Sequence, residues 1–399
     1  MIKKIQAPAS KSYLQRALAV SALAGGNTVL TNVSWCADSL SAKKIINKLG
    51  AITTEQNNTL EIQSSPLKFG DKNFFAGESG LSLRMFSPIL ALSDEEISFT
   101  GEGTLLKRPV KLIEEALSQL GVKVISNSGF LPLKIKGKIK AGKITIDGSL
   151  SSQLLSGLLI TLPLLDADSE ILVHNLKSRP YIDMTLAIIK DFGVNIENID
   201  YKKFTIKGKQ KYKARTYNIE GDWSGASFLL VYGAVKNAIE VNNLNPHSLQ
   251  ADKAILDVLQ KAGANVHIKT NSIIITPGKL KAFEFDASHC PDLFPPLVAL
   301  ATQCEGISKI KGVFRLLHKE SNRAMVIKQE LSKLGIEIEI NKDIMFIKQS
   351  QLKSGVINSH NDHRIAMLGG ILNLFSKEKI SVENKQAVNK SYPGFFDVI

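Results

Sequence analysis

Five glycines recur along the chain at nearly constant intervals of 71, 72, 70 and 72 residues. Each follows an apolar residue at the end of a segment whose apolar positions have helical spacing, and the pairs are Leu49-Gly50, Leu120-Gly121, Phe192-Gly193, Ala262-Gly263 and Leu334-Gly335. A glycine in this place is typical of a helix that ends in the left-handed conformation. So regular a period predicts repeats of one unit, which limits the possible folds more than any other feature of the sequence.

The residues after each glycine predict a β-hairpin. From Ile336 to Ile340 apolar and acidic residues alternate, a polar turn follows at 341–343, and an apolar run returns through 344–347. Analogous turns occur at Asn57-Asn58, Asn127-Ser128-Gly129 and Thr270-Asn271-Ser272. An earlier helix, apolar nearly all round and therefore buried, precedes each amphipathic one. One repeat is thus expected to contain a strand, a buried helix, a strand, an amphipathic helix and a hairpin.

Six buried helices are expected in all, and their starts lie near Ser12, Ser79, Ser152, Ser224, Asp292 and Asp362. The sixth repeat, from about residue 355 to 399, lacks a hairpin, whereas the strand-like Met1–Gln6 has no helix of its own. We therefore predict that this N-terminal strand completes the sixth repeat. Because the chain is too long for one hydrophobic core, two domains of three repeats each are expected, residues 10–217 and residues 1–9 plus 218–399.

The composition narrows the kind of partner. The formal net charge of +13 and the pI near 9.4 indicate an anionic partner, but the lysines are scattered and aromatic residues make up only 7%, which does not favour a nucleic-acid surface. The cysteines Cys36, Cys290 and Cys304 lack metal-ligand spacing and suit a reducing compartment. The N-terminus has no apolar leader, and the most apolar run, Leu154–Leu165, is shorter than the roughly 20 residues of a membrane span. We expect a soluble, cytoplasmic protein that binds a charged small molecule.

The segment Ala7–Leu18 predicts an anion site at a helix start. Pro8 and Ser10 lead into an apolar helical run, and Lys11 and Arg16 stand at its beginning. Free backbone N–H groups and the positive end of the helix dipole favour negative charge there, and the two side chains add formal positive charge. An ordinary serine cap with solvated basic residues would show the same pattern, so this segment alone leaves both interpretations open.

Other cations lie near predicted helix N-termini, where the helix dipole disfavours them: Arg108, Arg323 and Arg364. Their repeated placement favours compensation by a bound anion. Two carboxylates, Asp292 and Glu320, stand among these basic segments. A carboxylate in such a place is either a structural counter-ion or a proton-transfer group, and the residue types alone do not decide between them.

Seven motifs of the chain occur in the order and spacing of the enolpyruvyl-shikimate-phosphate synthases, which the chain resembles over essentially its whole length. The motifs are Lys11-Ser12 with Arg16, Arg108-Pro109, Ser151-Ser152-Gln153, Ser178-Arg179-Pro180-Tyr181-Ile182-Asp183, Lys319-Glu320-Ser321-Asn322-Arg323, Asn361-Asp362-His363-Arg364 and Lys390-Ser391-Tyr392-Pro393. Each is weak alone, but seven in register are specific. The resemblance implies two inside-out α/β barrel domains, each of three βαβαββ-type repeats with helices inside and sheets outside, and a monomer.

The resemblance also implies an enzyme that transfers the carboxyvinyl group of phosphoenolpyruvate to the 5-hydroxyl of shikimate 3-phosphate, with no metal or organic cofactor. Carried over by position, the residues for shikimate 3-phosphate are Lys11, Ser12, Arg16, Ser151, Ser152, Gln153, Ser178, Tyr181, Asp292 and Lys319. Those for phosphoenolpyruvate are Lys11, Gly80, Arg108, Gln153, Arg323, Arg364 and Lys390. Asp292 would accept the hydroxyl proton, and Glu320 or Lys11 would supply and retrieve the proton of the methylene carbon.

The chain departs from the family pattern in three places. Glu78-Ser79-Gly80-Leu81 replaces the usual Asn-Ala-Gly-Thr, which is expected to bring the Glu78 carboxylate close to the phosphate of phosphoenolpyruvate and to weaken its binding by repulsion. Arg315 stands about where an Asn often contacts the shikimate, and Asn322 replaces an Asp.

Two alternatives belong to other classes of function. An enolpyruvyl transferase acting on UDP-N-acetylglucosamine would carry Lys-Asn at the first helix and a Cys in a mobile loop, whereas here Ser12 follows Lys11 and none of the cysteines lies in a matching loop. A basic scaffold that binds polyanions without catalysis would lose affinity steeply as salt increases.

Overall fold

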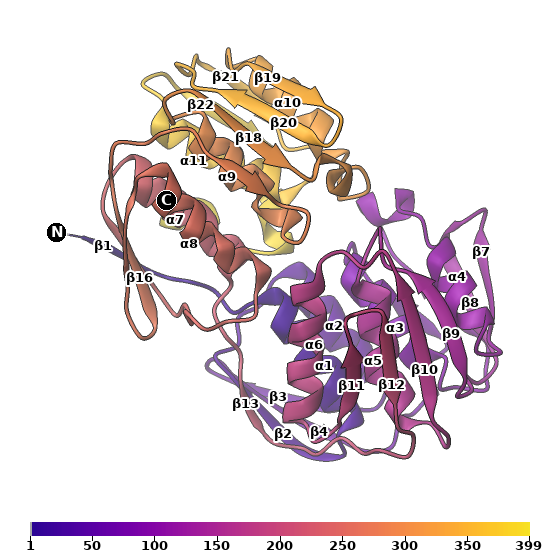
Figure 1. Ribbon diagram of the computed structural model, residues 1–399. Helices are drawn as coiled ribbons and strands as arrows, with labels where there is room; N and C mark the ends of the chain where they lie inside the picture. The colour runs from indigo at the N-terminus through magenta and orange to yellow at the C-terminus, as the bar shows by residue number, and fades with distance from the viewer. Residues whose placement is uncertain (1) are drawn as a thin grey trace. The chain divides into compact units, whose positions relative to one another are not determined.

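The computed structural model describes residues 2–399, and its internal contacts divide the chain into two compact units (Figure 1). The first unit is Lys11–Ile219, and the second unit combines Met1–Ser10 with Glu220–Ile399. The chain therefore begins in the second unit and passes between the units twice, after Ser10 and after Ile219.

The first unit contains three repeats of the predicted α/β pattern. The first repeat is built from β13 (Thr216–Asn218), α1 (Lys11–Leu23), β2 (Gly26–Thr31), α2 (Ala37–Lys48), β3 (Ile52–Gln56) and β4 (Thr59–Ser64). The second is built from β5 (Asn73–Phe75), α3 (Gly80–Leu90), β6 (Ile97–Thr100), the 3-10 turn η1 (Gly103–Lys107), α4 (Lys111–Ser118), β7 (Lys123–Asn127) and β8 (Phe130–Lys136). The third is built from β9 (Lys143–Asp147), α5 (Gln153–Thr161), η2 (Leu162–Leu164), β10 (Ser169–His174), α6 (Arg179–Asp191), β11 (Ile196–Ile199) and β12 (Lys203–Ile206).

The second unit repeats the pattern three more times. The fourth repeat is built from β1 (Lys3–Gln6), α7 (Trp223–Val235), β14 (Ile239–Asn242), η3 (Ala251–Ala254), α8 (Ile255–Ala262), β15 (Asn265–Ile268) and β16 (Ser272–Thr276). The fifth is built from β17 (Glu284–Asp286), η4 (Pro291–Leu293), α9 (Phe294–Ala301), β18 (Ile307–Lys311), η5 (Val313–Leu316), α10 (Arg323–Ser332), β19 (Ile338–Asn341) and β20 (Ile344–Lys348). The sixth is built from β21 (Gly355–Asn358), α11 (His363–Phe375), β22 (Ile380–Glu383), η6 (Lys385–Lys390) and α12 (Phe395–Val398).

The glycines that mark the period end helices as predicted. All five have a left-handed backbone, with φ of 98°, 80°, 89°, 101° and 77° at Gly50, Gly121, Gly193, Gly263 and Gly335. An antiparallel hairpin follows each of them, in β3–β4, β7–β8, β11–β12, β15–β16 and β19–β20. In each of these repeats the returning strand of the hairpin also pairs with the second strand of the repeat, so that four strands form one sheet.

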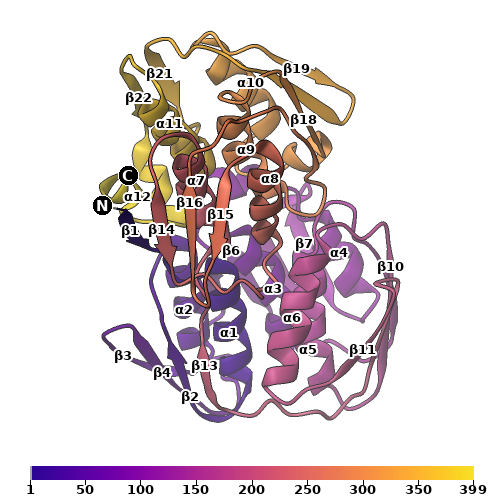
Figure 2. The same cartoon turned by 60° about the vertical axis from the view of Figure 1, so that its left-hand side comes forward.

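One helix of each repeat lies in the interior of its unit, with the sheets outside (Figures 1 and 2). The helices α3 and α9 are buried along their whole length. In the first unit α3 and α5 pack so closely that a Cβ on Gly157 would lie 2.5 Å from the carbonyl oxygen of Met85. In the second unit α7, α9 and α11 pack against one another. The buried helices therefore form the two cores and bring their N-termini to polar loops.

The N-terminal strand goes to a different repeat from the one predicted. β1 pairs in parallel with β14, from Lys3 opposite Ile239 to Gln6 opposite Asn242, so it completes the fourth repeat and not the sixth. In exchange β13, which precedes α7 in the chain, pairs with β2 of the first repeat. β1 belongs to the second unit and β13 to the first, so each lies in the unit that the chain leaves directly after it. Each pairs with the second strand of a repeat in that unit. Met1 lies outside the described residues, within which the sixth repeat has a two-stranded sheet of β21 and β22.

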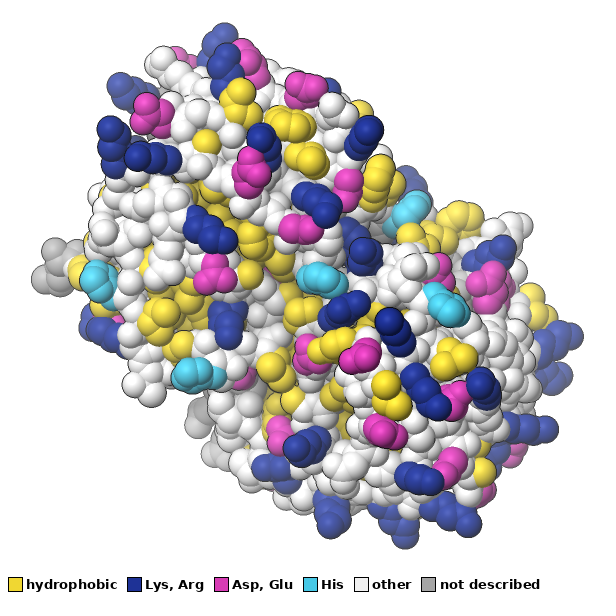
Figure 3. Space-filling model, viewed as in Figure 1, with side chains coloured by type: hydrophobic (Ala, Val, Ile, Leu, Met, Phe, Trp, Pro, Cys, Tyr) yellow, Lys and Arg dark blue, Asp and Glu magenta, His cyan; other side chains and the backbone are white. Residues whose placement is uncertain are grey.

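Charged side chains are spread over the visible face of both units (Figure 3). Ion pairs also join charged side chains of neighbouring strands, such as Lys143 with Glu170 and Lys309 with Glu284. Among residues 2–399, no helix is both long enough and apolar enough to cross a membrane.

Candidate active site

Lys11 is the first residue of α1 and pairs with a carboxylate of the neighbouring helix. Its Nζ lies 2.8 Å from Oδ2 of Asp38, the second residue of α2, where negative charge suits the positive end of the helix dipole. The backbone carbonyl of Asp38 also accepts a hydrogen bond from Gln15 Nε2 at 3.0 Å. The N-termini of α1 and α2 therefore meet, and the Lys11 ammonium is fixed at that point.

Arg16 lies about one turn further along α1 and is 1% exposed. Its guanidinium donates to neutral oxygen atoms of three helices: Thr185 Oγ1 at 2.8 Å, the Ser12 carbonyl at 2.9 Å, Ser156 Oγ at 3.3 Å and the Tyr181 carbonyl at 3.4 Å. Burial lowers the pKa of Arg16 to about 10, so the side chain is still protonated at neutral pH. A buried cation among neutral dipoles is stabilised by an anion that approaches it.

The start of α3 lies beneath two guanidinium groups. A Cβ on Gly80 would stand 2.7 Å from Arg108 Nη1 and 2.8 Å from Arg84 Nη1, so a side chain there would displace the two guanidinium groups. Arg84 donates to the Gly80 carbonyl at 3.3 Å, the Pro109 carbonyl at 3.2 Å and Gln153 Oε1 at 3.2 Å. Both arginines are 8% exposed. Two cations that converge on a helix N-terminus suit a phosphate or a carboxylate.

Several residues predicted for the shikimate side begin α5 and α6. Ser152 is the N-cap of α5, and Ser151 Oγ accepts a hydrogen bond from the Gln153 N–H at 3.2 Å. Ser178 is the N-cap of α6 and has a left-handed backbone with φ of 56°, a conformation that a residue other than glycine adopts only where its surroundings enforce it. Tyr181 follows in the first turn of α6. These polar residues therefore gather at two neighbouring helix starts.

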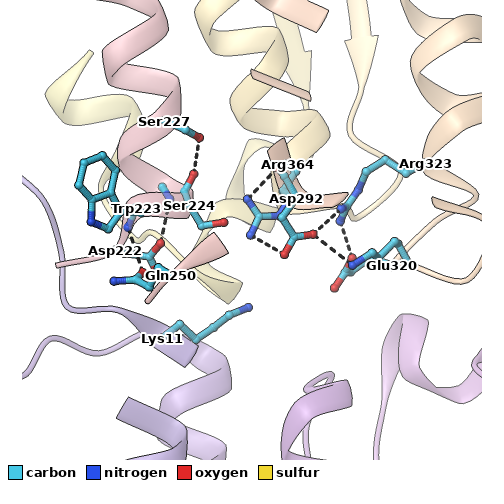
Figure 4. Close-up of polar contacts among 12 residues, drawn as sticks. Lys11, Asp222, Trp223, Ser224, Ser227, Gln250, Asp292, Glu320, Arg323 and Arg364 are labelled. Carbon is cyan, nitrogen blue, oxygen red and sulfur yellow. Dashed lines mark hydrogen bonds and ion pairs between the residues drawn. The ribbon is translucent and has the colours of Figure 1, made fainter. Parts of the chain in front are cut away.

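In the second unit Asp292 is held by three cations (Figure 4). Its Oδ1 lies 3.0 Å from Arg323 Nη1 and 3.2 Å from Lys319 Nζ, and its Oδ2 lies 3.1 Å from Arg364 Nη2. Burial alone would raise the pKa of Asp292, but the charges of Arg364, Lys319 and Arg323 hold it well below its usual range. The same burial lowers the pKa of Lys319. Asp292 lies in η4, directly before α9, and is ionised at neutral pH.

Arg323 is the most enclosed of these cations, with 0% of its side chain exposed. It begins α10 and donates to Asp362 from Nε at 2.9 Å and from Nη2 at 3.1 Å, and to Glu320 from Nη2 at 2.5 Å. Burial opposes its charge, but Asp362, Glu320 and Asp292 outweigh burial and raise the pKa of Arg323. Asp362 is also the N-cap of α11 and accepts the Arg364 N–H at 3.0 Å.

Lys390 supports the loop that enters α11. Its Nζ donates to the Asn361 carbonyl at 2.6 Å, and Asn361, with φ of 57°, directly precedes Asp362. Asn322, one of the departures from the family pattern, caps α10 by accepting the Met325 N–H at 3.4 Å. An aspartate would fill the same capping position, so this substitution preserves the helix start.

Glu320, Asp362 and His363 each offer one atom within 4.8 Å of the others, which is close enough for a metal ion. The Arg323 guanidinium, however, donates to both carboxylates, so positive charge already stands at their oxygen atoms. These residues fit an ion-pair network better than a metal centre.

The structure brings the predicted site residues together in two groups. The first unit carries Lys11, Ser12, Arg16, Gly80, Arg108, Ser151, Ser152, Gln153, Ser178 and Tyr181. The second unit carries Asp292, Lys319, Glu320, Arg323, Arg364 and Lys390, and also Arg315 in η5. Repeated cations at helix starts led us to expect a bound anion as their compensation, but in the second unit the carboxylates of the protein itself provide it.

Sequence reasoning missed Asp38 and Arg84, and it gave Asp362 no role beyond the start of a helix. Arg84 had a signal, because it is the one charged residue in the otherwise apolar and wholly buried α3. Asp38 had none, since an acidic residue in the first turn of a helix is common.

Comparison with known proteins agrees with the resemblance found in the motifs. The sequence profile of the family described as EPSP synthase (3-phosphoshikimate 1-carboxyvinyltransferase) matches residues 1–399. The 3-phosphoshikimate 1-carboxyvinyltransferase of Clostridium kluyveri is 38% identical over 397 residues, which cover 99% of this chain and 93% of the relative. That of Clostridium novyi is 37% identical over 405 residues, with 98% and 93% covered.

Solved structures of lower sequence identity share the fold. The EPSP synthase from Acinetobacter baumannii aligns with a TM-score of 0.82 at 24% identity, covering 99% of this chain and 94% of that one. The enolpyruvyl transferase NikO from Streptomyces tendae aligns with a TM-score of 0.79 at 15% identity, covering 99% and 93%. The predicted fold class is thus confirmed. Since the family profile matches from the first residue to the last, the chain belongs to the EPSP synthase family.

Proposed function

We propose that this chain transfers the carboxyvinyl group of phosphoenolpyruvate to the 5-hydroxyl of shikimate 3-phosphate, the activity that the names of its relatives indicate. The hydroxyl oxygen bonds to the central carbon of phosphoenolpyruvate while the methylene carbon gains a proton. The tetrahedral intermediate then loses a proton from the new methyl group and expels phosphate. The products are 5-enolpyruvylshikimate 3-phosphate and inorganic phosphate.

The observation that carries this proposal is the concentration of buried cations at helix N-termini. Each substrate bears a phosphate and a carboxylate, so binding both requires several positive charges in addition to helix dipoles. Arg16 is enclosed by neutral oxygen atoms, and Arg84 and Arg108 converge on Gly80. Positive charge that is buried in this way gains stability from an anionic ligand.

The residues divide between the substrates as follows. We assign shikimate 3-phosphate to Lys11, Ser12, Arg16, Ser151, Ser152, Gln153, Ser178, Tyr181, Asp292 and Lys319. We assign phosphoenolpyruvate to Lys11, Gly80, Arg108, Gln153, Arg323, Arg364 and Lys390. To these we add Arg84, because it donates to Gln153 Oε1 and stands beside Arg108 over Gly80.

Asp292 is assigned to the 5-hydroxyl. Its low pKa makes it a weak base toward a free alcohol, but the hydroxyl proton becomes acidic as its oxygen bonds to carbon, and an ionised carboxylate within reach can then accept it. Lys319, whose Nζ lies 3.2 Å from Asp292, would donate to the same hydroxyl oxygen. The three cations around Asp292 also keep its position fixed.

The carbon proton is assigned to Glu320 or Lys11. Glu320 is held by Arg323 at 2.5 Å and Lys11 by Asp38 at 2.8 Å, so each is oriented by an oppositely charged partner. Substrate and intermediate are stabilised by the arginines, and phosphate leaves as an anion that these side chains already bind.

The test of this function is an assay of phosphate release from phosphoenolpyruvate with shikimate 3-phosphate as acceptor and without added metal. We expect one phosphate for each enolpyruvyl product, and no release when the acceptor is omitted. Release with UDP-N-acetylglucosamine instead would identify the alternative transferase, which the matches above do not favour. If the folded protein releases no phosphate when either acceptor is supplied, the proposal is overturned.

We further propose that the protein acts as a monomer in the cytoplasm. Cys36, Cys290 and Cys304 are all free and buried, which suits a reducing compartment. Light scattering of the purified protein should give the mass of one chain, and the mass of two chains would contradict the proposed state.

A further inference from the structure

In every repeat the first two strands pair in parallel, and one more hydrogen bond joins them just beyond the end of the first strand. The residue after the first strand donates its N–H to the last carbonyl of the second strand, in the pairs Ala76–Thr100, Gly148–His174, Ile219–Thr31, Ala7–Asn242, Ala287–Lys311 and Ser359–Glu383. In five repeats the next residue of the second strand's loop is left-handed, namely Asn32, Asn175, Asn243, Gly312 and Asn384. The chain turns sharply there.

The second repeat does not make this turn. Its two loops, which follow β5 and β6, stay hydrogen-bonded to each other beyond the Ala76–Thr100 pair. Gly101 is not left-handed, and Glu102 donates its N–H to the Gly77 carbonyl at 2.9 Å. Thr104 then donates twice to Glu78 Oε2, from its backbone N–H at 2.8 Å and from its hydroxyl at 3.0 Å. The Glu78 carboxylate thus joins the loop before α3 to the segment that leads to α4.

Two glycines make room for this contact. Gly103 has φ of +56°, and a Cβ there would lie 2.3 Å from both Cδ and Oε2 of Glu78. The carboxylate therefore packs against the backbone of Gly103. A Cβ on Gly101 would lie 2.9 Å from the Gly77 carbonyl oxygen. A larger residue at Gly101 would therefore push the loops apart, and one at Gly103 would displace the Glu78 carboxylate.

The contact lies next to the proposed phosphoenolpyruvate residues. Thr104 belongs to η1, which ends at Lys107 and has Arg108 as its C-cap, and the Arg108 N–H donates to the Leu105 carbonyl at 3.1 Å. Glu78 stands two residues before Gly80, over which the Arg108 guanidinium lies. A bond between Glu78 and Thr104 therefore sets where Arg108 stands relative to the start of α3.

We propose that Glu78 is a positioning residue for Arg108: its carboxylate holds η1 against the start of α3 and so places the Arg108 guanidinium over Gly80. This inference rests on the proposed binding of phosphoenolpyruvate by Arg108. It differs from the expectation that Glu78 acts by repelling the substrate phosphate. Repulsion predicts that removing the charge tightens phosphoenolpyruvate binding, whereas positioning predicts that removing the acceptor weakens it.

The test compares Glu78→Ala with Glu78→Gln. The amide oxygen of Gln can accept both bonds from Thr104, so we expect E78Q to stay within about threefold of the wild-type KM for phosphoenolpyruvate. E78A loses both bonds and should raise that KM about tenfold, with the KM for shikimate 3-phosphate changed less than about twofold. Glu102→Gln removes the same charge from an exposed residue of the same loop and should leave both constants unchanged. A fall in the phosphoenolpyruvate KM in both E78A and E78Q, or an unchanged KM in E78A, would overturn the proposal.

A double-mutant cycle tests the contact itself. Gly103→Ala should raise the phosphoenolpyruvate KM because its methyl group collides with Glu78, and it should do so less in the E78A background, where the carboxylate is gone. Equal effects in both backgrounds would contradict a direct contact.

Hydrogen exchange separates this inference from the assignment of Arg108. The Thr104 amide should exchange at least about tenfold faster in E78A and at the wild-type rate in E78Q. If Arg108→Ala leaves the KM for phosphoenolpyruvate unchanged, the substrate assignment fails while the exchange result still decides the role of Glu78. Wild-type exchange in E78A would overturn that role.

Discussion

Two buried arginines, Arg16 in the first unit and Arg323 in the second, are compensated in opposite ways. Arg16 donates to hydroxyl and carbonyl oxygen atoms, and burial lowers its pKa to about 10. Arg323 donates to three carboxylates, which outweigh burial and raise its pKa. Both side chains lose their hydration on folding, but neutral dipoles restore less of the lost free energy than ionised partners do.

The comparison shows that a cation at a helix start does not by itself indicate a bound ligand. Around Arg323 the protein supplies its own negative charge, so an anionic substrate there must compete with Asp292, Glu320 and Asp362. Around Arg16 the hydrogen-bond partners are neutral oxygen atoms, so the negative charge would come from the substrate that we propose binds there. Ligand binding should therefore stabilise the surroundings of Arg16 more than those of Arg323.

Asp362→Ala is the strongest test of the carboxylates that surround Arg323. It leaves Arg323 without two of its hydrogen bonds and removes the cap of α11. Breaking a buried ion pair from one side is strongly destabilising, so we expect the free energy of unfolding to fall by about 3–5 kcal/mol. Urea denaturation measures it, and Asp362→Asn, which retains an acceptor oxygen, should lose less. A loss below about 1 kcal/mol in D362A would show that the carboxylates are not what stabilises Arg323.

Asp292→Ala tests whether a carboxylate in this cluster is more than a counter-ion. If Asp292 accepts the hydroxyl proton, turnover should fall by about two orders of magnitude or more. Asp292→Asn is the matched control, since it keeps the size of the side chain and loses the base, and it should be impaired as severely. Near-normal turnover in either folded variant would return Asp292 to a purely structural role.

Much of the fold could be predicted because its signals are local. The period of the glycines, the helix starts and the hairpins each depend on a few neighbouring residues, and all five glycines are left-handed as predicted. The partner of β1 could not be predicted in this way. Its alternating pattern, with Ile5 buried between exposed neighbours, fits the edge of any of the sheets, and the choice depends on where the chain crosses between units.

The candidate site was predictable in its cations and in two of the carboxylates that pair with them, Asp292 and Glu320, but not in the others. A basic residue at a helix start stands out because the dipole disfavours it, as with Lys11 and Arg323. Two carboxylates that sequence reasoning missed as partners, Asp38 and Asp362, are ordinary capping or first-turn residues in the sequence. Only the packing of α1 on α2, and of α10 on α11, brings each pair together.

Asp252→Asn tests a carboxylate of the second unit whose negative charge is stabilised less than that of Asp292. Asp252 is 3% exposed, and burial, with the charge of Asp292, raises its pKa to about 6. At this residue the folded state binds more protons than the unfolded state between about pH 4 and 6, so the contribution of Asp252 to wild-type stability should fall as pH rises through that window. The free energy of unfolding of D252N, relative to wild type, should increase there by up to about 3 kcal/mol. A constant difference from pH 4 to 7 would contradict the raised pKa.

Ser156→Ala tests the neutral oxygen atoms around Arg16 and should have the smallest effect of these substitutions. Ser156 Oγ lies 3.3 Å from Arg16 Nη2 and 2.9 Å from Thr185 Oγ1, so the change removes one long hydrogen bond to the guanidinium and leaves the shorter one from Arg16 Nε to Thr185. We expect a loss of about 1 kcal/mol in urea denaturation, because no single neutral dipole holds much of the charge. If S156A were as destabilising as D362A, the neutral oxygen atoms would compensate Arg16 as fully as carboxylates compensate Arg323. The negative charge of a substrate would then add little to the stability of the Arg16 guanidinium.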